Sequence, residues 1–165
     1  MNNRPKIKLK QTKTDILAEV FGWVSLVAFW AFVLVNYANL PDTIPTHFDY
    51  AGKADGFDDK ESVFELLLVA TVIFIGMTIL GKFPHIFNYP TEITEENALK
   101  QYTNATRLLR YIKLIIVVVF GVITLQSVRV ANGQINDIGS WLLPATLGLI
   151  FIPVFYFLIK SFQLK

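Results

Sequence analysis

The sequence predicts an all-α integral membrane protein with four transmembrane helices. Four apolar blocks carry this prediction, at residues 16–37, 63–80, 108–128 and 138–159. Each block is close to the ~20 residues that a helix needs to cross a ~30 Å hydrocarbon core. Hydrophobic residues make up 53% of the 165 residues. The blocks are apolar all round, whereas a surface helix of a soluble domain keeps a polar face.

Lysine and arginine are distributed unevenly between the two sides of these helices. If the N-terminus lies inside, twelve basic residues lie on the inner side and three on the outer side. The three outer residues are Lys53, Lys60 and Arg129. Because basic residues are retained on the cytoplasmic side, we expect both termini to be cytoplasmic and the loop between the first two helices to be extracytoplasmic.

The first apolar block is expected to stay in the protein as a membrane helix. Five basic residues precede it, as in a signal peptide, but the block is longer than the ~7–15 apolar residues of a signal core. The sequence "VNYANLP" after it is also a poor cleavage site. The remaining segments are a basic tail (1–15), an outer loop (38–62), an inner loop (81–107), an outer turn (129–137) and a C-terminal tail (160–165).

The outer loop is too apolar for a flexible linker, so we expect a small folded unit. "THFDY" is typical of a short strand, and Ala51-Gly52 and Asp55-Gly56 are turn signals at which glycine supplies a positive φ. In the inner loop, Thr94 is the predicted N-cap of an amphipathic helix that begins at Glu95 and continues into the third span. Gln101 and Asn104 lie away from its apolar face.

Within the first span, Ala18 and Gly22 have the small-xxx-small spacing that permits close helix contact. Glu19 and Lys113 fall near the ends of their spans, which leaves the middle of every span without charge. We expect Glu19 to reach lipid headgroups or to pair with a lysine. Four helices without midplane charge are a poor path for ions or protons.

The residues with chemical potential lie mainly in the outer loop, and they are His47, Asp49 and Asp55. A His47–carboxylate pair is the general-base arrangement in this chain, but such a histidine also serves to tie a loop together. The chain has no cysteine, and setting Gly56 as the glycine of a calcium-binding EF-hand fails at the ligand positions. We therefore expect no enzyme, no metal and no cofactor, and the net charge of +2 gives no basic surface for nucleic acid.

The stretch "LPDTIPTHFDYAGKADGFDDK" resembles the signature loop of bacterial membrane proteins known as domain of unknown function 1648, with the pattern LPxxIPxHFxxxGxxDxxxxK. Pro45, His47, Phe48, Gly52 and Asp55 occupy positions of that pattern. "NYPTEITEENALKQYTNATRLLRYIK" is similar to a second block of these proteins. The SdpI-type immunity proteins are the best-known relatives. The resemblance implies a bacterial plasma membrane and recognition of an extracellular peptide, although a tract resembling GIRTPWT is missing from this chain.

Together these observations predict a non-enzymatic binding or sensing protein, embedded in the lipid bilayer, that meets an extracytoplasmic ligand through its outer loop. The candidate residues are His47, Asp49, Gly52, Asp55, Pro45 and Phe48. The same residues serve equally well as structural parts of the loop. The alternative function is an accessory subunit of a larger membrane transport assembly, with a protein partner or a second copy of the chain.

Overall fold

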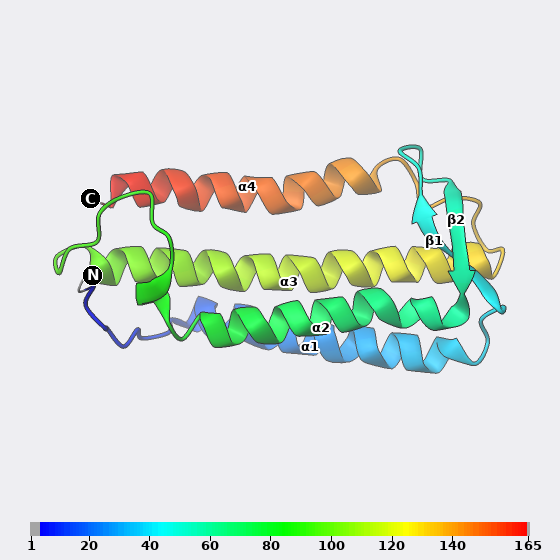
Figure 1. Ribbon diagram of the computed structural model, residues 1–165, viewed down its shortest axis with the longest axis horizontal. Helices are drawn as coiled ribbons and strands as arrows, with labels where there is room; N and C mark the ends of the chain where they lie inside the picture. Colours follow the sequence, from blue (N-terminus) through cyan, green and yellow to red (C-terminus); the bar gives the residue numbers. More distant parts are fainter. Residues whose placement is uncertain (1–3, 165) are drawn as a thin grey trace.

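The computed structural model describes residues 4–164, in which four long helices run along a common axis (Figure 1). They are α1 (Lys13–Tyr37), α2 (Val63–Leu80), α3 (Ala98–Ala131) and α4 (Leu142–Gln163). All four are long and apolar enough to span a membrane. Between α1 and α2, the strands β1 (Thr43–Phe48) and β2 (Ala54–Asp59) form an antiparallel hairpin. The four membrane-length helices and the small folded loop are therefore confirmed.

The two chain ends lie at one end of the helices and the hairpin lies at the other (Figure 1). We call these the inner end and the outer end, names that describe position in the molecule. At the inner end, Arg4 donates hydrogen bonds from Nη1 to the carbonyls of His85 (3.3 Å) and Phe87 (2.6 Å). Its guanidinium also lies 5.5 Å from the centre of the Tyr89 ring. The described part of the predicted basic tail is thus folded onto the inner loop; residues 1–3 of that tail lie outside the described range.

Helices α1, α2 and α3 pack around a shared apolar core. Val33, Leu67 and Phe74 are fully buried, and Val117 is nearly so. A Cβ on Gly22 would lie 2.8 Å from the Phe74 ring, so the absence of a side chain there lets α1 and α2 approach closely. The predicted role of Gly22 as a close-contact residue is confirmed.

Helix α4 packs mainly on α3, and buried amides fasten its inner end. Gln101 Nε2 donates to the Ser161 carbonyl (2.9 Å), and Ser161 Oγ donates to Gln101 Oε1 (2.7 Å). Asn104 Nδ2 donates to the Phe157 carbonyl (2.8 Å). The sequence placed Gln101 and Asn104 away from the apolar face of this helix but did not predict their burial, which comes from the packing of α3 against α4.

Two predicted helix starts are wrong. Helix α3 begins at Ala98 rather than Glu95, although Thr94 and Asn97 exchange hydrogen bonds with each other's backbone N–H, as in a capping box at the predicted N-cap. Helix α4 begins at Leu142 rather than residue 138, because Gly139 has a φ of +82° that breaks the helix. The predicted continuity of α3 into the third span is confirmed.

The hairpin pairs Pro45 with Phe57 and His47 with Gly56, with irregular register on both sides of His47. Gly52 has a φ of +84°, which confirms its predicted turn role. The turn predicted at Gly56 is wrong, because Gly56 lies within β2 and has no positive φ. A Cβ there would stand 2.8 Å from the His47 Cβ, so this glycine allows a close approach between strands.

Candidate functional site

His47 and Asp55 form the most direct polar contact of the hairpin. His47 Nδ1 lies 2.5 Å from Asp55 Oδ1, and the two side chains are 73% and 48% exposed. The predicted pairing of His47 with a loop carboxylate is thus present, with Asp55 as the partner. When Nδ1 carries the proton toward Asp55, the other ring nitrogen, Nε2, is free to accept a hydrogen bond.

Asp49 and Gly52 hold the tip of the hairpin. Asp49 Oδ1 accepts hydrogen bonds from the backbone N–H of Ala51 (2.8 Å) and Lys53 (2.9 Å), as aspartate does in turns. The Gly52 carbonyl accepts a bond from the backbone N–H of Ile138 (2.9 Å), and a Cβ on Gly52 would lie 2.7 Å from the Gly139 nitrogen. Asp49 thus closes the turn, and Gly52 joins the hairpin tip to the loop that leads into α4.

Pro45 and Phe48 differ in their positions on β1. Pro45 is buried beside Ile44, which belongs to the apolar core of the bundle, so this part of β1 anchors the hairpin. Phe48 is partly exposed at the end of β1 and lines a pocket at the outer end. Pro45 therefore has a structural position, and Phe48 is available to a ligand.

The outer pocket lies between the hairpin and the outer parts of α3 and α4. Its volume is about 370 Å³, within the range of small-molecule sites. The hairpin contributes residues 46–50 and Gly52, and the helices and their connecting loop contribute mainly apolar side chains. Those apolar residues include Ile123, Ile138, Leu142 and Leu143. Four of the six candidate residues, namely His47, Phe48, Asp49 and Gly52, line this pocket.

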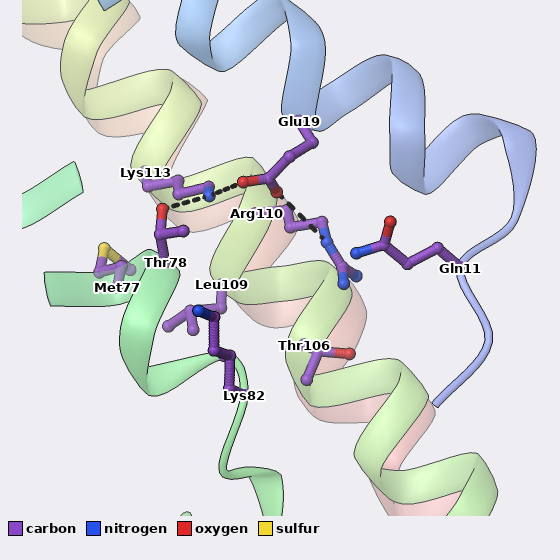
Figure 2. A pocket seen from close by; sticks show the side chains of 10 residues that line it. Gln11, Glu19, Met77, Thr78, Lys82, Thr106, Leu109, Arg110 and Lys113 are labelled. Atoms are coloured by element: carbon purple, nitrogen blue, oxygen red, sulfur yellow. Dashed lines mark hydrogen bonds and ion pairs between the residues drawn. The ribbon is translucent and has the colours of Figure 1, made fainter. Parts of the chain in front are cut away.

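A second group of charged side chains joins α1 to α3 near the inner end (Figure 2). Lys113 Nζ donates to Glu19 Oε1 (2.5 Å) and to Thr78 Oγ1 of α2 (2.7 Å). Arg110 Nε lies 3.5 Å from Glu19 Oε2, and Arg107 Nε donates to Asp15 Oδ1 (2.9 Å). The side chains of Lys113 and Asp15 are 2% and 5% exposed. The predicted pairing of Glu19 with a lysine is correct, and this pair belongs to a largely buried ion-pair network.

The spacing of acidic and basic residues in the sequence already indicates this network. Asp15 and Glu19 are four residues apart, so they share one face of a helix, and Arg107, Arg110 and Lys113 recur every three residues on another. Two acidic residues near the start of one apolar block and three basic residues near the start of another indicate facing helices. What the spacing does not specify is burial, which depends on how α2 covers the cluster.

Within residues 4–164, no group of three or more His, Asp or Glu side chains is arranged to hold a metal ion. The expectation that the protein needs no metal or cofactor stays a prediction. Tyr89 in the inner loop is half-buried, which raises the pKa of its phenol, and its hydroxyl donates to the Pro84 carbonyl (2.8 Å).

The comparisons with known proteins concern the outer end. Residues 24–74 match a family model described as "Domain of unknown function (DUF1648)". The matched segment runs from the middle of α1 through the hairpin into α2, so it contains the six candidate residues and none of the basic residues of α3. The predicted resemblance to this family is thereby supported as a domain match, while the specific loop pattern and the relation to SdpI-type immunity proteins stay predictions.

An uncharacterized protein of Archaeoglobus fulgidus is 30% identical over 78 residues, and the match covers 41% of each chain. The chain therefore spans less than half the length of this relative. No solved structure matches the chain. These findings describe an uncharacterised domain with membrane-like helices and add no activity to it.

Proposed function

We propose that this protein is a non-enzymatic membrane sensor that binds an amphipathic extracytoplasmic ligand in the outer pocket. The observation that carries the proposal is the composition of that pocket. One wall is the polar hairpin around His47, and the other is the apolar start of α4 around Leu142 and Leu143. A ligand that filled the pocket would contact both walls at once.

The proposal places the outer end outside the cell membrane and both termini in the cytoplasm. The support is the excess of basic residues on the predicted inner side of the sequence, twelve against three. The shared location of the termini at the end opposite the hairpin agrees with this arrangement (Figure 1). A bacterial plasma membrane is the membrane that we propose.

His47 would recognise the polar part of the ligand. Its bond to Asp55 orients the ring, and Nε2 then offers an acceptor, or a donor when the ring is protonated. The apolar part of the ligand would pack on α4, which rests mainly on α3. Binding would therefore change how α4 sits on α3 and carry the signal toward the inner end.

Photo-crosslinking in native membranes tests this proposal. Benzoylphenylalanine replaces Tyr50, which lines the pocket and is 86% exposed, and in a control it replaces Asp58, an exposed hairpin residue outside the pocket. We expect a defined adduct from position 50 and none from position 58. Thr146→Trp, which fills the pocket, should abolish the adduct, while Leu149→Trp, on the exposed surface of α4, should not. Equal adducts in all four proteins would overturn the proposal.

The alternative is an accessory subunit of a membrane transport assembly. The observation that favours it is the exposure of α4. In an apolar stretch of 18 residues, 11% of α4 is buried inside the protein, against 22% for each of the other three helices. Exposed apolar residues such as Phe151, Ile152 and Phe155 would then meet a partner chain instead of lipid. A stoichiometric partner that co-purifies with the wild type but not with Ile152→Lys would support this alternative.

A further inference from the structure

A second pocket lies at the inner end, between α1, α2 and α3 (Figure 2). Its volume is about 160 Å³. Its polar lining comes from the segment before α1, from all three helices and from Lys82, which follows the end of α2. The lining includes Gln11, Glu19, Thr78, Lys82, Arg110 and Lys113. This pocket is at the opposite end of the bundle from the proposed sensor site.

The charges around this pocket do not balance. Three cations, Lys82, Arg110 and Lys113, face one carboxylate, Glu19. Asp15 is near but is engaged by Arg107 through two hydrogen bonds, of 2.9 and 3.3 Å. The lining therefore holds two more basic side chains than acidic ones.

Arg110 is the side chain that points to a ligand. It is only 15% exposed, yet its contacts with Glu19 (3.5 Å) and Asp15 (3.7 Å) are ion pairs without a hydrogen bond. Within residues 4–164, none of its five N–H groups has a hydrogen-bond acceptor. This partly exposed guanidinium therefore has N–H donors that are available at the wall of a polar pocket.

Other donors converge on the same space. Lys113 Nζ uses two of its three N–H groups on Glu19 and Thr78. Lys82 is exposed at the mouth and makes no ion pair with any described residue, and Gln11 brings a carboxamide. In Figure 2 the Gln11 side chain extends toward the Arg110 guanidinium. Cationic and amide donors around a planar guanidinium match the tetrahedral oxygens of a phosphate group.

We propose that this inner pocket binds a phosphate group that carries a net negative charge, held by Arg110, Lys82 and Gln11. Two sources have this chemistry, namely the headgroup of an anionic phospholipid and a soluble phosphate. The apolar residues Met77 and Leu109 in the lining and the location at the end of α2 favour the headgroup. Bound there, the phosphate would bridge α1, α2 and α3.

The test uses the full chain in mild detergent and measures the retention of added lipid by native mass spectrometry. The probes are phosphatidylglycerol, the neutral phosphatidylcholine and inorganic phosphate. We expect phosphatidylglycerol to bind at least tenfold more tightly than phosphatidylcholine. Lys82→Gln should weaken its binding about fivefold to tenfold, since one charge-assisted contact is lost. Lys100→Gln, an exposed inner-end lysine outside the pocket, should bind like the wild type.

Arg110→Gln should lower retention further, and because it alters the ion-pair network, its unfolding is measured in parallel. Lys82→Gln is exposed and keeps the test decisive if Arg110→Gln does not fold. Competition by inorganic phosphate would identify a soluble phosphate as the source, and its failure to compete would identify the lipid headgroup. Equal retention of both lipids without any effect of phosphate, or a Lys82→Gln protein that binds like the wild type, would overturn the proposal.

Discussion

The two ends of this bundle use the same charged chemistry in opposite surroundings. At the outer end, His47 and Asp55 meet in a pair whose side chains are 73% and 48% exposed. At the inner end, Lys113 meets Glu19 with side chains that are 2% and 23% exposed. An exposed pair is screened by water and contributes little to stability, whereas a buried charge is strongly destabilising without its partner. The inner network is therefore part of the framework, and the outer pair is available for binding.

The two ends also attach α4 in different ways. At the inner end, Gln101 and Asn104 bond directly to the backbone of α4. At the outer end, a backbone contact between Gly52 and the residues 138–139 joins the hairpin to the start of α4. Buried amides thus fix the inner end of α4, whereas a turn holds its outer end. This difference suits the proposal that α4 responds to events at its outer end. The predictions below test this contrast, beginning with the largest effect.

Glu19→Leu should cause the largest loss of stability. It leaves the buried Lys113 without its carboxylate, and such a break costs about 3–5 kcal/mol. Unfolding by denaturing detergent, followed through tryptophan fluorescence, measures the change. The double variant Glu19→Leu with Lys113→Met should recover most of it, because the unpaired ammonium is gone. A single variant within 1 kcal/mol of the wild type would show that the network is not structural.

Gln101→Leu should cost about 2–3 kcal/mol, because it removes the bonds of Gln101 to the Ser161 and Leu164 carbonyls and leaves the buried Ser161 hydroxyl without its acceptor. The same unfolding assay, together with hydrogen exchange of α4 amides, measures the effect. Thr103→Ala is the control, since the hydroxyl bond it removes is exposed. If both variants behaved alike, the buried amides would not be what holds α4.

Gly52→Ala should loosen the hairpin tip. A positive φ costs an alanine about 1–2 kcal/mol, and the new Cβ would also stand 2.7 Å from the Gly139 nitrogen. Gly133→Ala is a matched control, because Gly133 has a φ of +67° with nothing within 4 Å of its Cβ position. Limited proteolysis of the hairpin should therefore accelerate more for Gly52→Ala than for Gly133→Ala. Equal rates would mean that the contact with Gly139 adds nothing.

Asp55→Asn should have the smallest effect on stability, below about 1 kcal/mol, because the pair it alters is exposed. Its effect should appear in binding, since the carboxylate orients His47. We expect the Tyr50 crosslink described above to weaken while the unfolding midpoint stays unchanged. A large drop in stability with an unchanged crosslink would reassign the pair to a structural role.

Much of the architecture was determined by the sequence alone. Four apolar blocks of membrane length predict the four helices. A segment in lipid has no water to bond its backbone N–H and C=O groups, so it must satisfy them internally, as a helix does. The positive φ at Gly52 and the pairing of His47 with a nearby aspartate also follow from local chemistry, since both depend on residues within one hairpin. Local signals were sufficient wherever the interacting groups are close along the chain.

The tertiary structure decided the features that join distant segments. Gly56 reads as a turn residue in the sequence, but its role is to admit the His47 Cβ from the opposite strand. The burial of Lys113 depends on α1 and α2 meeting α3 at one level, and that of Gln101 on the end of α4. Both pockets are likewise formed by segments far apart in sequence. Periodicity shows which residues share a face, but the partner of that face is chosen by packing across the whole bundle.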